Sequence, residues 1–228
     1  MKKGDVFEFY RRLAELNPTP QGELEWSNPY TLLVAVALSA QATDVSVNIA
    51  TRKLFAVADS PQKLIDLGEE ELREHIKTIG LFNTKTKNVL RMAQQLLDEF
   101  GGDVPANRED LERLAGVGRK TANVVLNVAF GQPYIAVDTH IFRVGNRTGL
   151  APGKTPLAVE EKLEKVTPDV FKLHAHHWLI LHGRYICKAR KPECWRCPVA
   201  DLCRYKPKTP APPRSGPMPI ESVSEPGQ

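Results

Sequence analysis

The chain has 228 residues and a formal net charge of +4, with 42% hydrophobic and 25% charged residues. This length suffices for one substantial core or two small domains, and the composition is that of a globular protein, not of a disordered or fibrous one. The start, MKKGDVFEFYRRL, has charged residues where a signal peptide has its apolar core, and the longest apolar run, Tyr30 to Ala40, is too short to span a bilayer. We therefore expect a cytoplasmic protein with no secretion or targeting signal.

Helical periodicity runs through the chain, whereas the alternation typical of strands is scarce. Asn28-Pro29 and Ser60-Pro61 each place a capping residue before a proline, which indicates a helix start, and Thr43 can cap the helix that follows it. The remaining expected helices cover residues 6–16, 85–100, 107–114, 119–130, 139–148, 155–165 and 168–184. The pattern predicts an all-α fold of short helices joined by brief loops.

A glycine-containing turn, LAGVG from Leu114 to Gly118, joins two of these helices. Gly116 and Gly118 let the backbone turn tightly and come close to a ligand. The amides of the turn and the N-terminus of the next helix then form a group of N–H donors that suits an anion such as a DNA phosphate. A plain interhelical turn is the alternative, because two glycines before a helix are a weak signal by themselves.

Lys120 lies in the first turn of that next helix, where the helix dipole favours acidic residues. The dipole makes the neutral amine easier to reach, but it contributes only about 0.3–1 kcal/mol, and a lysine with the usual pKa of about 10.4 is almost fully protonated at neutral pH. Substantial desolvation would also be needed before the amine could act as a nucleophile. A half-buried lysine here is a candidate for a Schiff base, and a phosphate contact is the alternative.

Asp138 follows the apolar run YIAV and precedes an expected helix. Its simplest role is the N-cap of that helix. The loop of residues 131–137 could also bring Asp138 beside Lys120, where its carboxylate could stabilise a cationic transition state and relay protons. A carboxylate is too weak a base to deprotonate an ammonium outright, and a permanent pair with Lys120 would raise the lysine pKa.

All four cysteines, Cys187, Cys194, Cys197 and Cys203, lie close together with the spacing C-x6-C-x2-C-x5-C. Four thiols in such short loops, without a signal for an oxidising compartment, indicate a metal centre more than disulfides. Zinc and a [4Fe–4S] cluster both accept four cysteines. Structural zinc sites usually have two close pairs of ligands, whereas only Cys194 and Cys197 form one here, so the spacing favours iron–sulfur only slightly.

Positive charge is concentrated around these cysteines. Residues 184–208 include eight Lys or Arg and two acidic residues, so this stretch carries +6 while the rest of the chain carries −2. Such a patch is typical of a protein that binds a polyanion, although a solvated basic segment would look the same. The loop KARKPE between the first two cysteines is cationic, which a purely structural metal site would not require.

The chain resembles the endonuclease III family, bifunctional DNA glycosylases and abasic-site lyases of the helix-hairpin-helix superfamily. The resemblance rests on the hairpin with Lys120, the cysteine spacing and three further motifs, which are LSAQATD (Leu38–Asp44), TIGLFNTKTKNV (Thr78–Val89) and VDTHIFRVGNR (Val137–Arg147). The joint occurrence of these motifs over residues 38–203 is very specific. One departure is Ala115, where the family usually has proline. Losing the proline loosens the unfolded chain and costs about 0.4–1 kcal/mol of stability, but both glycines remain.

The resemblance implies two α-helical domains that bind duplex DNA in the cleft between them. Residues 21–131 would form a six-helix domain that ends in the hairpin, and residues 1–20 with 132–208 would form a domain that holds one [4Fe–4S] cluster on the four cysteines. Residues 209–228 are rich in Pro and Ser and are expected to form a disordered tail. We expect a monomer without membrane association, located in the cytoplasm of a bacterial cell and associated with the nucleoid.

The resemblance also implies roles for single residues. Lys120 would attack C1′ of the deoxyribose, expel an oxidised pyrimidine such as thymine glycol and form an imine, after which β-elimination cuts the strand 3′ to the abasic site. Asp138 would support charge development and proton transfer. The other implied contacts with DNA are Gln41, which fills the vacated stack, Leu81, which wedges beside the opposite base, and Gly116, Val117, Gly118, His140 and Lys191. Without the resemblance, a loop hydrogen bond for Gln41, core packing for Leu81 and a capping or packing role for His140 are the simpler interpretations.

Two other functional classes compete with this interpretation. A monofunctional relative that acts on mismatched adenine, thymine or uracil would typically lack a lysine at position 120. A non-catalytic DNA-binding or redox-sensing iron–sulfur protein would keep the cysteines and the basic loop but would not need Lys120 together with Asp138. Lys120 therefore favours the glycosylase with lyase activity.

Overall fold

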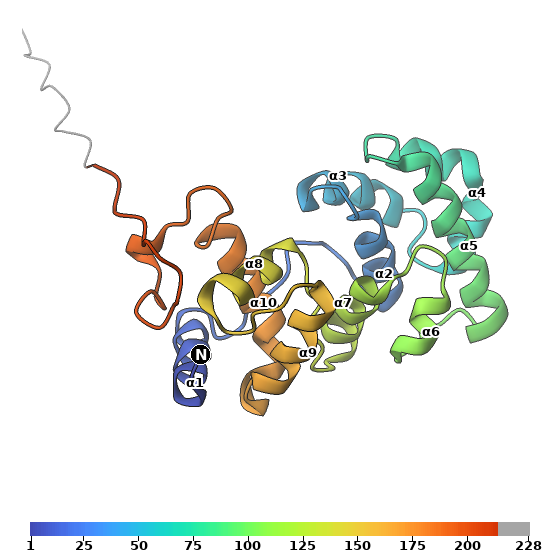
Figure 1. Ribbon diagram of the computed structural model, residues 1–228. Helices are drawn as coiled ribbons and strands as arrows, with labels where there is room; N and C mark the ends of the chain where they lie inside the picture. Colours follow the sequence, from blue (N-terminus) through green and yellow to red (C-terminus); the bar gives the residue numbers. More distant parts are fainter. Residues whose placement is uncertain (214–228) are drawn as a thin grey trace, which may run out of the picture.

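The computed structural model describes residues 1–213, so most of the expected Pro- and Ser-rich tail, from residue 214 on, lies outside the described residues. The described chain consists of helices and loops, without a strand (Figure 1). The helices are α1 (Lys3–Leu16), α2 (Pro29–Leu38), α3 (Asp44–Phe55), α4 (Pro61–Ile76), α5 (Phe82–Phe100), α6 (Arg108–Arg113), α7 (Arg119–Phe130), α8 (Thr139–Thr148), α9 (Pro156–Val166), α10 (Asp169–Tyr185) and the 3₁₀ helix η1 (Cys194–Arg196). None of the helices within residues 1–213 has both the length and the apolar character that crossing a bilayer requires.

Most helices begin where the capping residues of the sequence predict. Asn28 and Thr31 form a reciprocal capping box at α2, and the side chains of Thr43 and Ser60 each accept the backbone N–H three residues further on. These caps satisfy amide groups that a helix cannot pair internally, which is why short polar residues fix the helix starts.

The start of α5 differs from the sequence-based prediction. The helix begins at Phe82, about one turn before the predicted residue 85, because Leu81 takes a left-handed conformation and ends the preceding turn. No side chain caps α5, so no residue type marks its start. The capping rules therefore could not have found this boundary.

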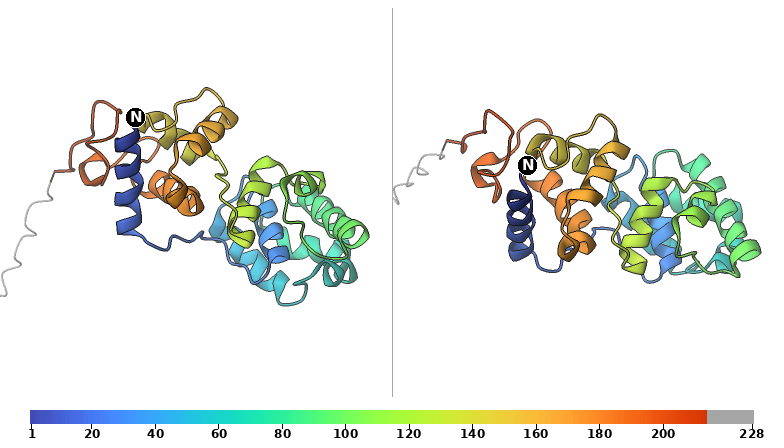
Figure 2. Two further views of the ribbon diagram at one scale, coloured as in Figure 1. Left: turned by 90° about the horizontal axis from the view of Figure 1, so that it is seen from below. Right: turned by 60° about the horizontal axis from the view of Figure 1, so that its bottom comes forward.

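The described chain has two separate hydrophobic cores. The first lies among α2–α7 and includes the fully buried Leu33 and Leu72. The second lies among α1 and α8–α10 and includes Leu179, together with Val199 from the cysteine-containing segment. Figure 2 shows that α1, although it begins the chain, lies beside the helices from the C-terminal part of the sequence.

Two ion-pair groups connect the halves that surround these cores. Arg119, the first residue of α7, donates to the buried Glu160 of α9, with an N–O distance of 2.8 Å. Arg184 of α10 donates to Asp44 of α3 at 2.6 Å. Each group joins a helix of one core to a helix of the other, so the boundary between the halves is partly polar.

Candidate functional site

A cleft of about 540 Å³ lies at this boundary and brings together residues from several sequence motifs. Ser39 and Asp44 reach it from the segment between α2 and α3, and Lys120 reaches it from the start of α7. Asp138 and His140 reach it from the start of α8. The fold therefore places the two residues singled out as nucleophile and carboxylate, eighteen positions apart in sequence, in the wall of one cavity.

Lys120 is the second residue of α7, and Gly118 is the N-cap of that helix. Its side chain is exposed, so the expectation of a half-buried lysine is wrong for the protein without DNA. The reason is local, since the side chain leaves the first helical turn directly into the open cleft. Among the described residues no carboxylate pairs with Lys120, so the permanent pair with Asp138 that would have raised the lysine pKa is not formed.

Asp138 caps α8 and lines the cleft at the same time. Its Oδ1 accepts the backbone N–H of Ile141 at 2.8 Å, which is the N-cap interaction expected from the sequence. The carboxylate is partly exposed and faces the same cavity as Lys120. One oxygen therefore holds the start of α8, and the group as a whole stays accessible from the cleft.

The hairpin turn before Lys120 uses its two glycines differently. Gly116 has a φ of 77°, and a Cβ at this position would lie 3.1 Å from the Cβ of Asn88, so both conformation and space favour glycine. A Cβ on Gly118 would meet nothing within 4 Å, which leaves the backbone amides there open to a ligand. Val117 between them is buried in the first core, so its side chain anchors the turn.

Ala115, which stands where the family usually has proline, makes a hydrogen bond that proline could not make. Its backbone N–H donates to Oε1 of Gln95 at 2.8 Å, and Nε2 of the same side chain donates to the carbonyl of Arg113 at 3.2 Å. The side chain of Gln95 on α5 thus connects the backbone of the hairpin turn to α5. This contact restrains the turn and so compensates for part of the rigidity that is lost without the proline.

Gln41 and Leu81 are the two non-glycine residues with left-handed backbone conformations within residues 1–213, with φ values of 56° and 61°. Such a conformation costs roughly 1–2 kcal/mol for a residue with a Cβ. Leu81 is 59% exposed, so the core-packing interpretation is wrong for it. Gln41 is also exposed, and its side chain makes no hydrogen bond within the described residues. The two residues lie on adjacent turns, since a Cβ on Gly80 would be 3.9 Å from the carbonyl oxygen of Gln41.

His140 has a packing role and also lines the cleft. A Cβ on Gly183 would lie 2.8 Å from the Cβ of His140, so α8 and α10 approach each other closely at this point. Nδ1 of His140 lies 3.1 Å from a guanidinium nitrogen of Arg143, which donates to the carbonyl of Gly183 at 2.8 Å. His140 therefore lies at a tight helix contact that forms one edge of the cleft.

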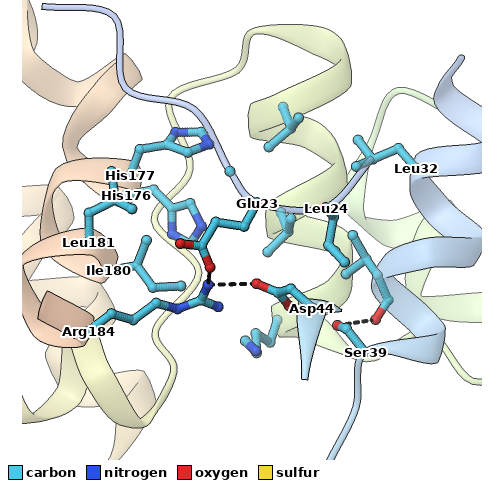
Figure 3. Close-up of a pocket in the computed structure, with 15 residues that line it drawn as sticks. Glu23, Leu24, Leu32, Ser39, Asp44, His176, His177, Ile180, Leu181 and Arg184 are labelled. Carbon is cyan, nitrogen blue, oxygen red and sulfur yellow. Dashed lines mark hydrogen bonds and ion pairs between the residues drawn. The ribbon is translucent and has the colours of Figure 1, made fainter. Parts of the chain in front are cut away.

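A second, smaller cavity of about 90 Å³ adjoins the cleft and shares Ser39, Asp44, Lys120, Ile180 and Arg184 with it. Figure 3 shows Arg184 between Asp44 and the carboxylate of Glu23, to which it also donates. We did not single out this ion-pair group from the sequence, because its members lie far apart in the chain. Asp44 is the one member that lies in a motif noted in the sequence, LSAQATD.

Two buried histidines of α10 line this second cavity. His176 and His177 have ring Nδ1 atoms without a hydrogen-bond partner among the described residues. Burial, the neighbouring His177 and the charges of Lys120 and Arg184 lower the pKa of His176 to about 3. Burial, with a smaller contribution from His174, lowers the pKa of His177 to about 4. Both rings are therefore neutral at physiological pH, and no metal ligation is needed to explain them.

The four cysteines surround one small cavity in the segment after α10. All four are free and partly buried, and burial raises the pKa of the Cys197 thiol to about 11, so a bound cation would be needed to keep it as a thiolate. Within residues 1–213 no three His, Cys, Asp or Glu side chains are arranged to hold a single metal ion. Four thiols that line one cavity are a ligand set that an iron–sulfur cluster accepts.

The loop between the first two cysteines exposes part of its positive charge. Lys188 and Arg196 both form ion pairs with Glu193, so these charges are partly neutralised. Arg190 and Lys191 lie exposed at the loop tip and make no ion pair within the described chain. Since Arg184 is also paired, the part of the predicted basic patch that is free for a polyanion is smaller than the sequence count indicates.

Comparison with known proteins identifies the family. Residues 34–169 match the family model of the HhH-GPD superfamily base excision DNA repair proteins, and residues 187–203 match that of the iron-sulfur binding domain of endonuclease III. The chain is 60% identical to endonuclease III of Haemophilus influenzae over 91% of its own length and 99% of that protein. The chain belongs to the endonuclease III family. It is also 59% identical, with the same coverage, to endonuclease III of Escherichia coli strain K12.

Solved structures of endonuclease III share this fold. A trapped covalent intermediate of endonuclease III with DNA aligns with a TM-score of 0.84 and 43% sequence identity, covering 90% of this chain and 96% of that one. The comparisons confirm the predicted all-α helix-hairpin-helix fold, and they show that the protein is a base excision repair DNA glycosylase with abasic-site lyase activity. They also decide between zinc and iron–sulfur, since the family carries a [4Fe–4S] cluster on these four cysteines. The non-catalytic interpretation is therefore wrong.

Proposed function

We propose that the protein removes oxidised pyrimidines, such as thymine glycol, from duplex DNA through a Schiff base on Lys120, and then cuts the strand 3′ to the abasic site. The observation that carries this proposal is the placement of Lys120 and Asp138 in one cleft, each at the start of a helix. The structural similarity to an endonuclease III bound covalently to DNA supports the same reaction class.

The two cores support a division into two domains, residues 21–131 and residues 1–20 with 132–208, with DNA bound across the cleft between them. The expected tail of residues 209–228 begins with Thr209, whose hydroxyl accepts the backbone N–H of Cys194 at 3.1 Å, so the cluster segment extends at least to this residue. We further propose that the protein is a monomer that acts at the bacterial nucleoid in the cytoplasm, and its bacterial relatives support a bacterial setting.

In the first step the neutral amine of Lys120 attacks C1′ of the extruded nucleotide, and the C1′–N1 bond breaks. The electron pair of that bond leaves with the pyrimidine, which takes up a proton. After the attack Nζ loses a proton to solvent. Opening of the sugar ring then moves the O4′–C1′ electron pair to O4′, which is protonated, while the lone pair of Nζ forms the iminium bond to C1′. A base then removes a C2′ proton, the 3′-phosphate leaves C3′, and water hydrolyses the imine to release the unsaturated aldehyde and the lysine amine.

Asp138 would act in this sequence as a carboxylate close to developing positive charge. A group that stabilises the cationic sugar contributes to catalysis even when it is a weak base, because the charge appears only near the transition state. The exposed position of Lys120 means that the DNA itself has to desolvate the amine, by closing the cleft over it. This requirement would confine the nucleophilic attack to the DNA-bound enzyme.

The remaining DNA contacts follow from the exposed groups around the cleft. The backbone N–H groups of Gly116 and Gly118, which make no backbone hydrogen bond within the described chain, would bind a backbone phosphate, and the tip of the cysteine loop, with Lys191, would extend the phosphate contacts. Gln41 and Leu81 would enter the duplex when the damaged nucleotide is flipped out, since base chemistry in a duplex requires extrusion. Their exposure and left-handed backbone support this role.

The decisive experiment traps the intermediate. We expect borohydride to link the wild-type protein covalently to duplex DNA with one thymine glycol, and Lys120→Gln to abolish the adduct while leaving the cluster absorbance unchanged. Lys63→Gln, which removes an exposed lysine of α4 that does not line the cleft, serves as the matched control and should trap normally. A Lys120→Gln protein that traps as efficiently as wild type would disprove the assignment.

A further inference from the structure

Lys85 on α5 is a buried lysine outside the cleft. Its side chain is only 7% exposed, and burial lowers the pKa of its amine. No carboxylate within residues 1–213 pairs with it. A buried cation without a counter-charge is costly, and a methionine of similar length would fill the same space, so packing alone does not explain a lysine here.

The contacts of Lys85 join the two exposed left-handed residues. Its Nζ donates to the carbonyl oxygen of Ala40 at 2.8 Å, and Ala40 directly precedes Gln41. Its backbone N–H donates to the carbonyl oxygen of Leu81 at 3.0 Å and closes the first turn of α5 on that residue. One residue therefore holds the backbone of both segments, which are about forty residues apart in sequence.

Apart from this contact, the turn that carries Gln41 is held by Ala42, which packs against the first core, and by a hydrogen bond within the turn. The N–H of Ala42 donates to the carbonyl oxygen of Ser39 at 3.0 Å, which closes the turn on itself but does not attach it to α5. The Lys85 amine supplies a side-chain hydrogen bond from α5 to the peptide next to Gln41. The relative position of Gln41 and Leu81 thus depends on the reach of this side chain.

We propose that Lys85 is a positioning residue that fixes the spacing of Gln41 and Leu81, so that both side chains can enter the duplex together when a nucleotide is extruded. The inference rests on the proposed function, in which these two residues fill the space left in the stack. Lys85 does not reach the cleft, so its effect is confined to steps that need the base stack to be opened and held open.

The experiment compares one abasic site in two settings. The site is placed in a duplex and in the same strand without its complement, and the rate of borohydride-trapped adduct formation is measured in single turnover at saturating enzyme. For Lys85→Met we expect at least a tenfold slower rate on the duplex and a rate within twofold of wild type on the single strand, where no stack has to be filled. A 2-aminopurine opposite the site reports insertion directly, and its fluorescence change should fall with the duplex rate.

Lys87→Met is the matched control, because it removes an exposed positive charge from the same helix without touching the Ala40 contact. It should trap at the wild-type rate on both DNAs. Equal slowing by Lys87→Met, equal slowing of Lys85→Met on both DNAs, or an unchanged duplex rate in Lys85→Met would each overturn the proposal. Should Lys85→Met not fold, Lys85→Arg gives the same comparison, since its wider guanidinium displaces the Ala40 carbonyl and a loss on the duplex alone is again expected.

Three further variants separate this inference from the proposed function. If Lys120→Gln still traps, the Lys120 assignment fails whatever Lys85→Met shows. If Gln41→Ala and Leu81→Ala leave the duplex rate unchanged, the insertion roles fail, and the role of Lys85 fails with them. If Gln41→Ala and Leu81→Ala slow the duplex reaction but Lys85→Met does not, the Lys85 proposal alone is wrong.

Discussion

The two halves of the protein are stabilised in different ways. The half formed by α2–α7 has a continuous apolar core, and its helices begin at caps that the sequence shows directly. The half formed by α1 and α8–α10 has its own apolar core, but residues 186–213, the described segment after α10, contain only the three-residue η1 and run around the cysteine cavity. The first half is therefore determined mainly by its own packing, whereas the end of the second half depends on a cofactor.

The two residues proposed to act in the reaction come from different halves. The nucleophile proposed for the reaction stands on α7 of the packed half, and the proposed carboxylate caps α8 of the cluster half. The pairs of Arg119 with Glu160 and of Arg184 with Asp44, together with the hydrogen bond from Nδ2 of Asn127 to the carbonyl oxygen of Leu173, link the two halves beside the cleft. A substitution in either half that alters these contacts can therefore change the distance between Lys120 and Asp138.

Removing a cysteine that binds the cluster should have the largest effect on structure, and the loss of structure should be confined to the half that holds the cluster. We expect Cys197→Ser to lose iron and the visible absorbance of the cluster, and to lose hydrogen-exchange protection over residues 186–209, because this segment has η1 as its one regular element and packs on the second core mainly through Val199 and Leu202. Protection of α2–α7 should persist, measured by hydrogen exchange with mass spectrometry. Equal loss of protection in both halves would show that they are one cooperative unit.

A cavity in the first core should have a smaller effect and leave the cluster in place. Leu72 is fully buried, so Leu72→Ala is expected to lower the free energy of unfolding by about 2–5 kcal/mol. Urea denaturation measures the loss, and iron content reports on the other half. Substantial loss of iron from the folded variant would contradict the separation of the two cores.

Acid should act on the boundary, and the contribution of each single histidine there should be the smallest of these effects. Because burial lowers the pKa values of His176 and His177 in the folded state to about 3 and about 4, the unfolded chain binds more protons as the pH falls below about 6.5, and stability falls with it. Each histidine should cost about 2 kcal/mol between pH 7 and pH 5. Urea denaturation of wild type and His176→Phe at both pH values checks this, and the variant should show the weaker pH dependence. An unchanged dependence would mean that His176 is not buried as a neutral ring in solution.

The residues of the proposed site differ in how well the sequence could indicate them. Asp138 was expected to be a cap or a cleft residue, and it occupies both positions, because an N-cap needs only one carboxylate oxygen. Lys120 was expected to be half-buried, but it is exposed, because sequence does not report which side of a helix N-terminus faces an open cleft. Lys85 was not singled out at all, since its partner is a backbone carbonyl, which any residue at position 40 would provide.

The sequence by itself determined what depends on neighbouring residues, namely the helices with visible caps, the glycines of the hairpin and the set of four clustered cysteines. Tertiary structure alone decided the pairing of Arg184 with Asp44 and Glu23, the burial of Lys85, the adjacency of Gln41 and Leu81 and the shared cleft of Lys120 and Asp138. The physical reason is that caps and tight turns are satisfied within a few residues, whereas ion pairs, burial and cavities depend on segments that meet only when the helices pack.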